Sequence, residues 1–232
     1  MFDLYYKKND NLGLFKSIED IGISNVQNYI PLYKQYFSLK STNYRNMNLN
    51  HHCHIHEVLA THKRNKFLCK IKSEKKILKK KSFFKFSPLL DPVKYMVGKY
   101  KDLGENVSTL LPSLENNKCH RKISDVNNSA YVDSFFSYLT SQLLNKSYFP
   151  NGLDFYGSFL GIQKEFLYNI ADDIEYLHES TYFHKNQNEK FKIENVDLSM
   201  IIDLNTRNYK KKLNIGKNIS NKSISSISNE DY

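Results

Sequence analysis

The sequence predicts an α+β protein with an antiparallel sheet of about five strands and one long helix packed against the sheet. The expected strands occupy residues 52–60, 66–72, 82–86, 153–162 and 165–170. The first three alternate apolar and polar side chains and follow one another with short connections, as in an antiparallel meander. A long segment with helical spacing separates them from the last two.

The first strand of the meander shows the alternation most clearly. One face carries Cys53, Ile55, Glu57 and Leu59, and the other carries His52, His54, His56 and Val58. Residues 63–65 should turn into the second strand, and residues 75–81 should form a lysine-rich turn into the third. Lys85 then lies within the third strand, which Pro88 ends because proline cannot donate to a strand ladder.

Two helices are expected after the meander. Asp91 is placed to cap a short helix over residues 91–98, with Pro92 at its first position. The longer helix spans residues 127–144 and begins with capping residues. It carries two neighbouring apolar stripes, through Tyr131, Phe135, Tyr138, Leu139 and Gln142 and through Val132, Phe136, Leu139 and Leu143. So wide an apolar face predicts burial against the sheet.

Composition divides the chain into three parts. Residues 1–30 are a peripheral N-terminal segment in which residues 17–29 can form a short helix. Residues 31–195 form the folded domain, beginning with an expected strand within residues 31–41. Residues 196–232 are rich in Asn, Ser, Lys and Ile, which predicts a disordered tail.

The positive charge is concentrated in one segment. The 232 residues carry a net charge of +10, and residues 62–85 contain eleven Lys or Arg and one acid. A basic patch of this kind suits weak nucleic-acid binding, chiefly through residues 75–81, from Lys75 to Lys81. The alternative is a solvated lysine-rich turn, which the absence of arginine and exposed aromatic residues from that run favours.

The cysteines and the hydropathy of the sequence indicate the cellular compartment of the protein. Cys53, Cys69 and Cys119 form no paired spacing, as expected of reduced thiols in a cytoplasmic protein. The sequence shows no signal peptide at its start and no apolar run of the roughly 20 residues that a membrane helix needs. We therefore expect no membrane association.

The histidine-rich strand is the one candidate metal site. Zinc needs three or four converging ligands. His52, His54 and His56 on one strand face would be roughly 7 Å apart in pairs, which suits two ligands but not three. An exposed polar face is the favoured interpretation, and we expect no metal. The sequence also contains no Gly-x-Ser-x-Gly, P-loop or dinucleotide-binding fingerprint.

The expected order of elements, three strands with a lysine in the third, then a helix and two strands, resembles the small lobe of a protein kinase. Three segments carry a closer resemblance, to kinase-like proteins of large nucleocytoplasmic DNA viruses. They are Phe-Phe-Lys-Phe-Ser-Pro-Leu-Leu-Asp-Pro-Val-Lys-Tyr-Met-Val-Gly-Lys-Tyr at 83–100, Tyr-Val-Asp-Ser-Phe-Phe-Ser-Tyr-Leu at 131–139 and Asp-Phe-Tyr-Gly-Ser-Phe-Leu-Gly at 154–161.

The resemblance implies a nucleotide-binding role for Lys85, which would contact the phosphates of ATP, and for Asp133, which would pair with it. Kinases use the longer Glu at the second position, and Asp133 is otherwise explained as a first-turn acid favoured by the helix dipole. The resemblance also implies a viral protein of the host cytoplasm or the virion.

The sequence departs from the kinase pattern at the residues that carry catalysis. It contains no Gly-x-Gly-x-x-Gly loop, no His-Arg-Asp loop and no Asp-Phe-Gly, and Asp203-Leu-Asn205 is only superficially similar to the last of these. We therefore expect a truncated or incomplete kinase-like domain without activity of its own. A separate large lobe or another protein would be its partner. The alternative is a basic nucleic-acid-binding or structural interaction module.

Overall fold

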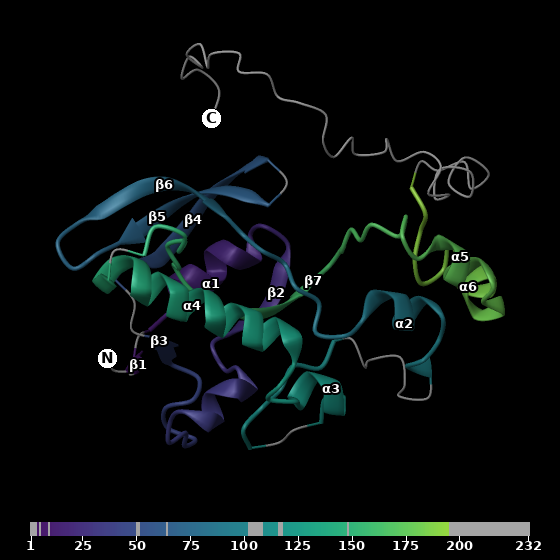
Figure 1. Cartoon of the computed structure of the whole chain (residues 1–232), viewed down its shortest axis with the longest axis horizontal. Helices are drawn as coiled ribbons and strands as arrows, with labels where there is room; N and C mark the ends of the chain where they lie inside the picture. Colours follow the sequence, from purple (N-terminus) through teal and green to yellow (C-terminus); the bar gives the residue numbers. More distant parts are fainter. Residues whose placement is uncertain are drawn as a thin grey trace, which may run out of the picture.

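A computed structural model describes residues 4, 6–8, 10–49, 52–63, 65–101, 109–115, 118–147 and 149–194. The predicted tail at residues 196–232 lies outside the described residues. Figure 1 shows the arrangement of the elements. In chain order they are β1 (Tyr6–Lys8), α1 (Leu12–Glu19), β2 (Ile23–Gln27), the 3-10 helix η1 (Pro31–Gln35), β3 (Met47–Leu49), β4 (His54–Lys63), β5 (Lys66–Lys72), β6 (Ile77–Phe83), α2 (Pro92–Met96), α3 (Arg121–Ser124), α4 (Ser129–Ser147), β7 (Leu160–Gln163), α5 (Ile174–His178) and α6 (Thr181–Asn186).

The α+β class and the antiparallel meander are as predicted, but the single five-stranded sheet is wrong. The strands form one sheet of order β4-β5-β6 and two separate pairs, β1 with β3 and β2 with β7.

Two glycines allow β2 to form and to pair with β7. Gly22, at a φ of +88°, follows α1 and lets the chain turn into β2, where a helix was expected. Gly161 lets β7 approach β2, because an added Cβ would lie 2.5 Å from Ile23. Residues 165–170 form no strand.

Strand β4 does not alternate with a period of two. Its pairing with β5 shifts three times, between Ile55 and Glu57, between Val58 and Ala60, and between Thr61 and Lys63. Each shift adds one residue to β4, so every third residue faces the core. Ile55 and Val58 are both buried for this reason, although the sequence pattern placed them on opposite faces.

Strand β6 begins earlier in the chain than predicted. The hairpin turn is short and closes with the N–H of Ser73 donating to the carbonyl of Lys76. Most of the expected lysine-rich turn is therefore strand, because lysines on a solvent-facing sheet surface keep their charges hydrated. β6 ends at Phe83, so Lys85 lies two residues beyond the strand and not in its middle.

The long helix α4 packs against a different surface from the one expected. Its buried side chains Tyr131, Phe135 and Tyr138 meet residues of η1, β3 and β7 in one core cluster. The predicted strand at residues 31–41 is the 3-10 helix η1, which begins at Pro31. Proline suits the first turn of a helix because its fixed φ is already helical. The described part of the chain shows no packing of α4 on a five-stranded sheet.

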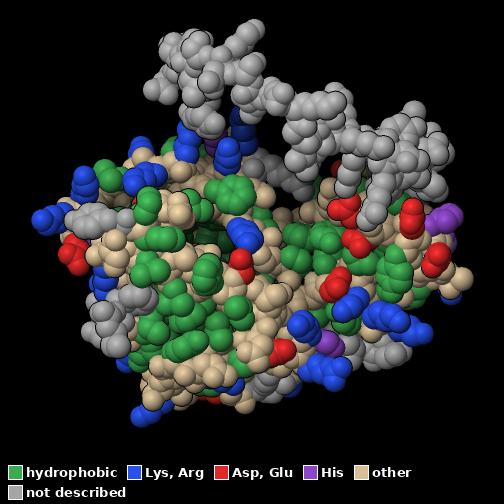
Figure 2. Space-filling view, viewed as in Figure 1, with side chains coloured by type: hydrophobic (Ala, Val, Ile, Leu, Met, Phe, Trp, Pro, Cys, Tyr) green, Lys and Arg blue, Asp and Glu red, His purple; other side chains and the backbone are tan. Residues whose placement is uncertain are grey.

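The second apolar stripe of α4 is exposed at its first two positions. Phe136 is 64% exposed and Val132 is also exposed, whereas Phe135 is buried and stacks on Tyr36 with ring centroids 4.6 Å apart. Figure 2 shows the resulting apolar surface, with hydrophobic side chains gathered over α4 in the lower left of the view. The prediction that both stripes are buried is therefore wrong for Val132 and Phe136, whereas Leu139, which belongs to both stripes, packs against the core.

Two further cores complete the fold. Helix α1 packs on the β4-β5-β6 sheet, where buried Ser17 accepts a hydrogen bond from the N–H of Val58 at 3.0 Å. Helices α2, α5 and α6 share a smaller cluster. The predicted cap of α2 is confirmed, since the Asp91 carboxylate accepts from the N–H groups of Val93 and Lys94. Over the described residues, no helix combines the length and apolar composition needed to cross a membrane.

Candidate functional site

Lys85 reaches α4 because of the alternation of side chains just beyond β6. Phe84 and Phe86 turn inward, with ring centroids 4.5 and 6.4 Å from that of Phe67. Lys85 lies between them and turns outward, and its Nζ donates to Oδ2 of Asp133 at 2.7 Å. The predicted pairing of Lys85 with Asp133 is confirmed, although its role in nucleotide binding stays a prediction.

The ion pair lies at the protein surface. The side chains of Lys85 and Asp133 are 63% and 45% exposed, and exposed pairs contribute only about 0–1 kcal/mol to stability. Asp133 is the fifth residue of α4, and no acidic residue occupies the first turn of that helix. The alternative explanation of Asp133 as a first-turn acid is therefore wrong. Its one described ionic partner is Lys85.

A pocket of about 390 Å³ opens beside this ion pair. Its size lies within the range of about 300–1,000 Å³ typical of small-molecule sites. The lining combines a lysine, two carboxylates and three hydroxyl groups with a proline wall: Lys85, Ser87, Pro88, Asp91, Pro92, Ser129, Ala130, Asp133 and Tyr168. The pocket thus joins the segment after β6 to the first turns of α4.

Asn128 holds these two segments together. Its side chain is buried, and its Nδ2 donates to the carbonyls of Leu89 and Lys122 at 2.9 and 2.8 Å. Its Oδ1 accepts from the N–H of Ala130, which caps α4. One side chain therefore ties the segment that follows Lys85 to the helix that carries Asp133. The sequence predicts capping at this point but not the two contacts that bridge segments.

Tyr168, which lines the pocket, has carboxylates near its hydroxyl group. Burial and the neighbouring carboxylates of Asp173, Asp91 and Asp172 raise the pKa of Tyr168. A ligand bound beside Lys85 would therefore have to tolerate nearby carboxylates. The Lys85 ammonium has three donors, so it can hold Asp133 with one and a phosphate oxygen with the others. Sequence reasoning missed Tyr168, because that segment was expected to form a strand.

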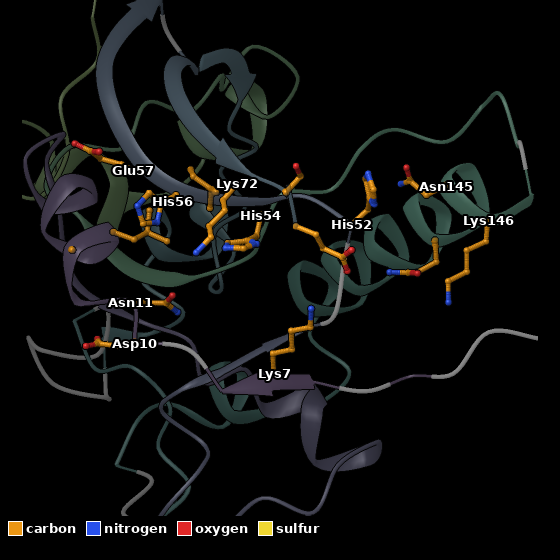
Figure 3. A pocket seen from close by; sticks show the side chains of 16 residues that line it. Lys7, Asp10, Asn11, His52, His54, His56, Glu57, Lys72, Asn145 and Lys146 are labelled. Atoms are coloured by element: carbon orange, nitrogen blue, oxygen red, sulfur yellow. The ribbon is translucent and has the colours of Figure 1, made fainter. Parts of the chain in front are cut away.

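A larger groove of about 750 Å³ lies at the other end of α4. Figure 3 shows side chains of different elements lining one hollow, with Lys7 from β1, His54 from β4, Lys72 from β5, and Asn145 and Lys146 from α4. Basic and acidic side chains both line it. This groove contains neither Lys85 nor Asp133, so the two hollows are separate sites.

His52, His54 and His56 all line this groove, although the strand register between His54 and His56 is irregular. His54 pairs with Lys72 and His56 is the extra residue at the first register shift. Within the described residues, no cluster of three or more His, Cys, Asp or Glu has the geometry to hold a metal ion. The expectation that no metal binds stays a prediction.

The pH dependence of stability tests whether His54 is shielded from water in this groove. Burial, followed by Lys72, His56 and Lys7, lowers the pKa of His54 below its ordinary value of about 6.5. As pH falls below about 6.5, the unfolded chain takes up this proton before the folded chain does. The free energy of unfolding therefore contains the full contribution of neutral His54 above about pH 6.5. It loses this contribution progressively as the pH falls toward the lower pKa of the folded state.

We expect His54→Gln to reduce the loss of stability between about pH 7 and pH 5. Urea unfolding followed by circular dichroism at several pH values measures this slope. His62→Gln, at the exposed end of β4, is the matched control and should keep the wild-type slope. Equal slopes in wild type and His54→Gln would contradict the assignment.

Comparison of the chain with protein families, curated proteins and solved structures finds no match. The resemblance to kinase-like proteins therefore stays a prediction from the sequence.

Proposed function

We propose that this chain is a kinase-related binding module that holds a nucleotide through its phosphates. The observation that carries the proposal is the ion pair between Lys85 and Asp133, which joins the end of the third meander strand to the next long helix. In kinases a lysine of the third strand binds the α and β phosphates while paired with an acid of the following helix. Here the lysine lies just beyond the strand, and its partner is Asp.

The surroundings of Lys85 supply further phosphate ligands. The hydroxyl groups of Ser87 and Ser129 line the same pocket. The pocket also opens at the first turn of α4, where the helix dipole is positive. These groups offset part of the repulsion from Asp91 and Asp133. In this proposal Lys85 binds the phosphate, and Asp133 positions the lysine.

The proposed function is binding, not phosphoryl transfer. Transfer requires a metal-binding Asp and a residue that orients the attacking hydroxyl, which kinases supply from the Asp-Phe-Gly and His-Arg-Asp motifs. Neither motif occurs in these 232 residues. A partner that carries them would complete the chemistry.

Lys85→Met tests the nucleotide site. We expect ATP to bind at least about tenfold more weakly to this variant, because a charge-assisted hydrogen bond contributes about 1.5–3 kcal/mol. Isothermal titration calorimetry with ATP measures the affinity. The free energy of unfolding should change by less than about 1 kcal/mol, since the ion pair is exposed.

Lys94→Met is the matched control for this experiment. Lys94 is 61% exposed and pairs with Asp91 at 3.7 Å, so it resembles Lys85 in exposure and in having an acidic partner. It does not line the pocket and should leave ATP affinity unchanged. Equal losses in both variants would attribute binding to general positive charge, and an absence of saturable ATP binding to wild type would refute the proposal.

A further inference from the structure

The β4-β5-β6 sheet has one face on the core and one face in solvent. Phe67, Cys69 and Ile71 of β5 point into the core. Alternate residues of β5, with their partners on β4 and β6, therefore form the opposite face, which we call the outer face. It consists of Glu57, Ala60, Lys63, Lys66, Leu68, Lys70, Lys72, Ile77, Lys79, Lys81 and Phe83, with His54 at one end.

The outer face is strongly basic. It presents six lysines and one acid, Glu57, which pairs with Lys70. Lys80 points to the other side, where its Nζ lies 3.4 Å from the hydroxyl of Tyr156. In Figure 2, Lys and Arg side chains gather along the upper left margin, over this sheet. The register of the β5-β6 hairpin thus places most lysines of this basic stretch on one side of the sheet.

Protection of a sheet edge explains only part of this charge. Lysines on edge strands discourage pairing with other chains, and this accounts for Lys79 and Lys81 on β6. Lys66, Lys70 and Lys72 lie on β5, which is paired on both sides and has no edge to protect. Lys66 lies opposite Lys63 on β4, and Lys70 lies opposite Lys79 on β6, and like charges directly opposite each other destabilise a sheet slightly. A bound polyanion would relieve that repulsion.

The outer face also carries exposed apolar side chains among the lysines. Phe83 is 65% exposed and lies opposite Lys66, and Ile77 is exposed at the other end of β6. An aromatic ring on a basic sheet can stack on an unpaired base, and such stacking is sequence-tolerant. A duplex keeps its bases stacked inside and would leave the ring of Phe83 without a partner.

We propose that the outer face of the β4-β5-β6 sheet binds single-stranded nucleic acid. The lysines contact successive phosphates, and Phe83 stacks on a base. This inference does not depend on the proposed nucleotide site, which lies around Lys85 and Asp133 and uses neither β5 nor the outer face.

The salt dependence of oligonucleotide binding tests the proposal. Fluorescence anisotropy with a labelled oligothymidylate measures affinity of the full chain between about 50 and 200 mM salt. Each phosphate contact in a single strand contributes about −0.7 to the slope of log affinity against log salt concentration, so six contacts predict roughly a 300-fold loss across this range. Lys79→Gln/Lys81→Gln should reduce the slope by about 1.4. Phe83→Ala should weaken binding about tenfold without changing the slope.

Lys75→Gln/Lys76→Gln is the matched control, because it removes the same charge from the turn outside the outer face. It should keep the wild-type slope, and Lys85→Met should keep full oligonucleotide affinity. Equal effects of the two double variants, tighter binding to a duplex of the same length, or binding to phosphatidylserine vesicles in preference to oligothymidylate would each overturn the proposal.

Discussion

Phe135→Ala is expected to lower the free energy of unfolding by about 3–5 kcal/mol, the usual cost of truncating a buried phenylalanine. The ring lies in the core cluster of α4, stacked on Tyr36 and 5.9 Å from Tyr138. Its removal leaves a cavity that these rings cannot fill without moving. Urea unfolding followed by circular dichroism measures the change.

Phe136→Ala is the control, since it removes the same atoms one residue later in the same helix. Phe136 lies on the exposed stripe, so its truncation should change stability by less than about 0.5 kcal/mol. If the alanine variant does not fold, Phe135→Leu is measured in its place. It should lower the free energy of unfolding by a smaller amount. Comparable losses at positions 135 and 136 would show that α4 buries a different face.

Asn128→Ala is expected to destabilise the protein by roughly 3 kcal/mol. The substitution removes two partly buried hydrogen bonds, to the carbonyls of Leu89 and Lys122, and each such bond contributes about 0.5–1.5 kcal/mol. It also removes the cap of α4, which contributes about 1 kcal/mol. Thermal and urea unfolding measure the loss.

Two variants separate these contributions. Asn127→Ala changes the exposed neighbour of Asn128 and should have an effect below about 0.5 kcal/mol. Asn128→Asp keeps an acceptor for the N–H of Ala130 but cannot donate to the two carbonyls. A wild-type stability for Asn128→Asp would mean that only the cap matters and that the bridge between segments contributes nothing.

Features that depend on neighbouring residues could be predicted from the sequence. The extent of α4 follows from its capping residues and apolar spacing, and the start of α2 follows from Asp91 and Pro92. Strand β5 is predicted correctly because its core face alternates strictly. The pairing of Lys85 with Asp133 was expected only from the resemblance to the kinase small lobe, because two residues 48 positions apart share no local pattern.

Features that depend on distant partners could not be predicted. β2 pairs with β7 from the other end of the domain, and no local pattern indicates which strand completes which pair. The register shifts of β4 depend on its pairing with β5 and turn a two-residue pattern into a three-residue one. Asn128 and Tyr168 enter the candidate site only because the chain folds back on itself.

The sequence alone determined the α+β class, the meander, the long helix α4 and the start of α2. Each depends on backbone propensities and side-chain periods that act over a few residues. The tertiary structure decided which stripe of α4 is buried, because burial requires a partner surface, and η1 and β3 cover only one stripe. It also decided that the lysines of β5 and β6 share one face, because hydrogen-bond register brings alternate residues of two strands together.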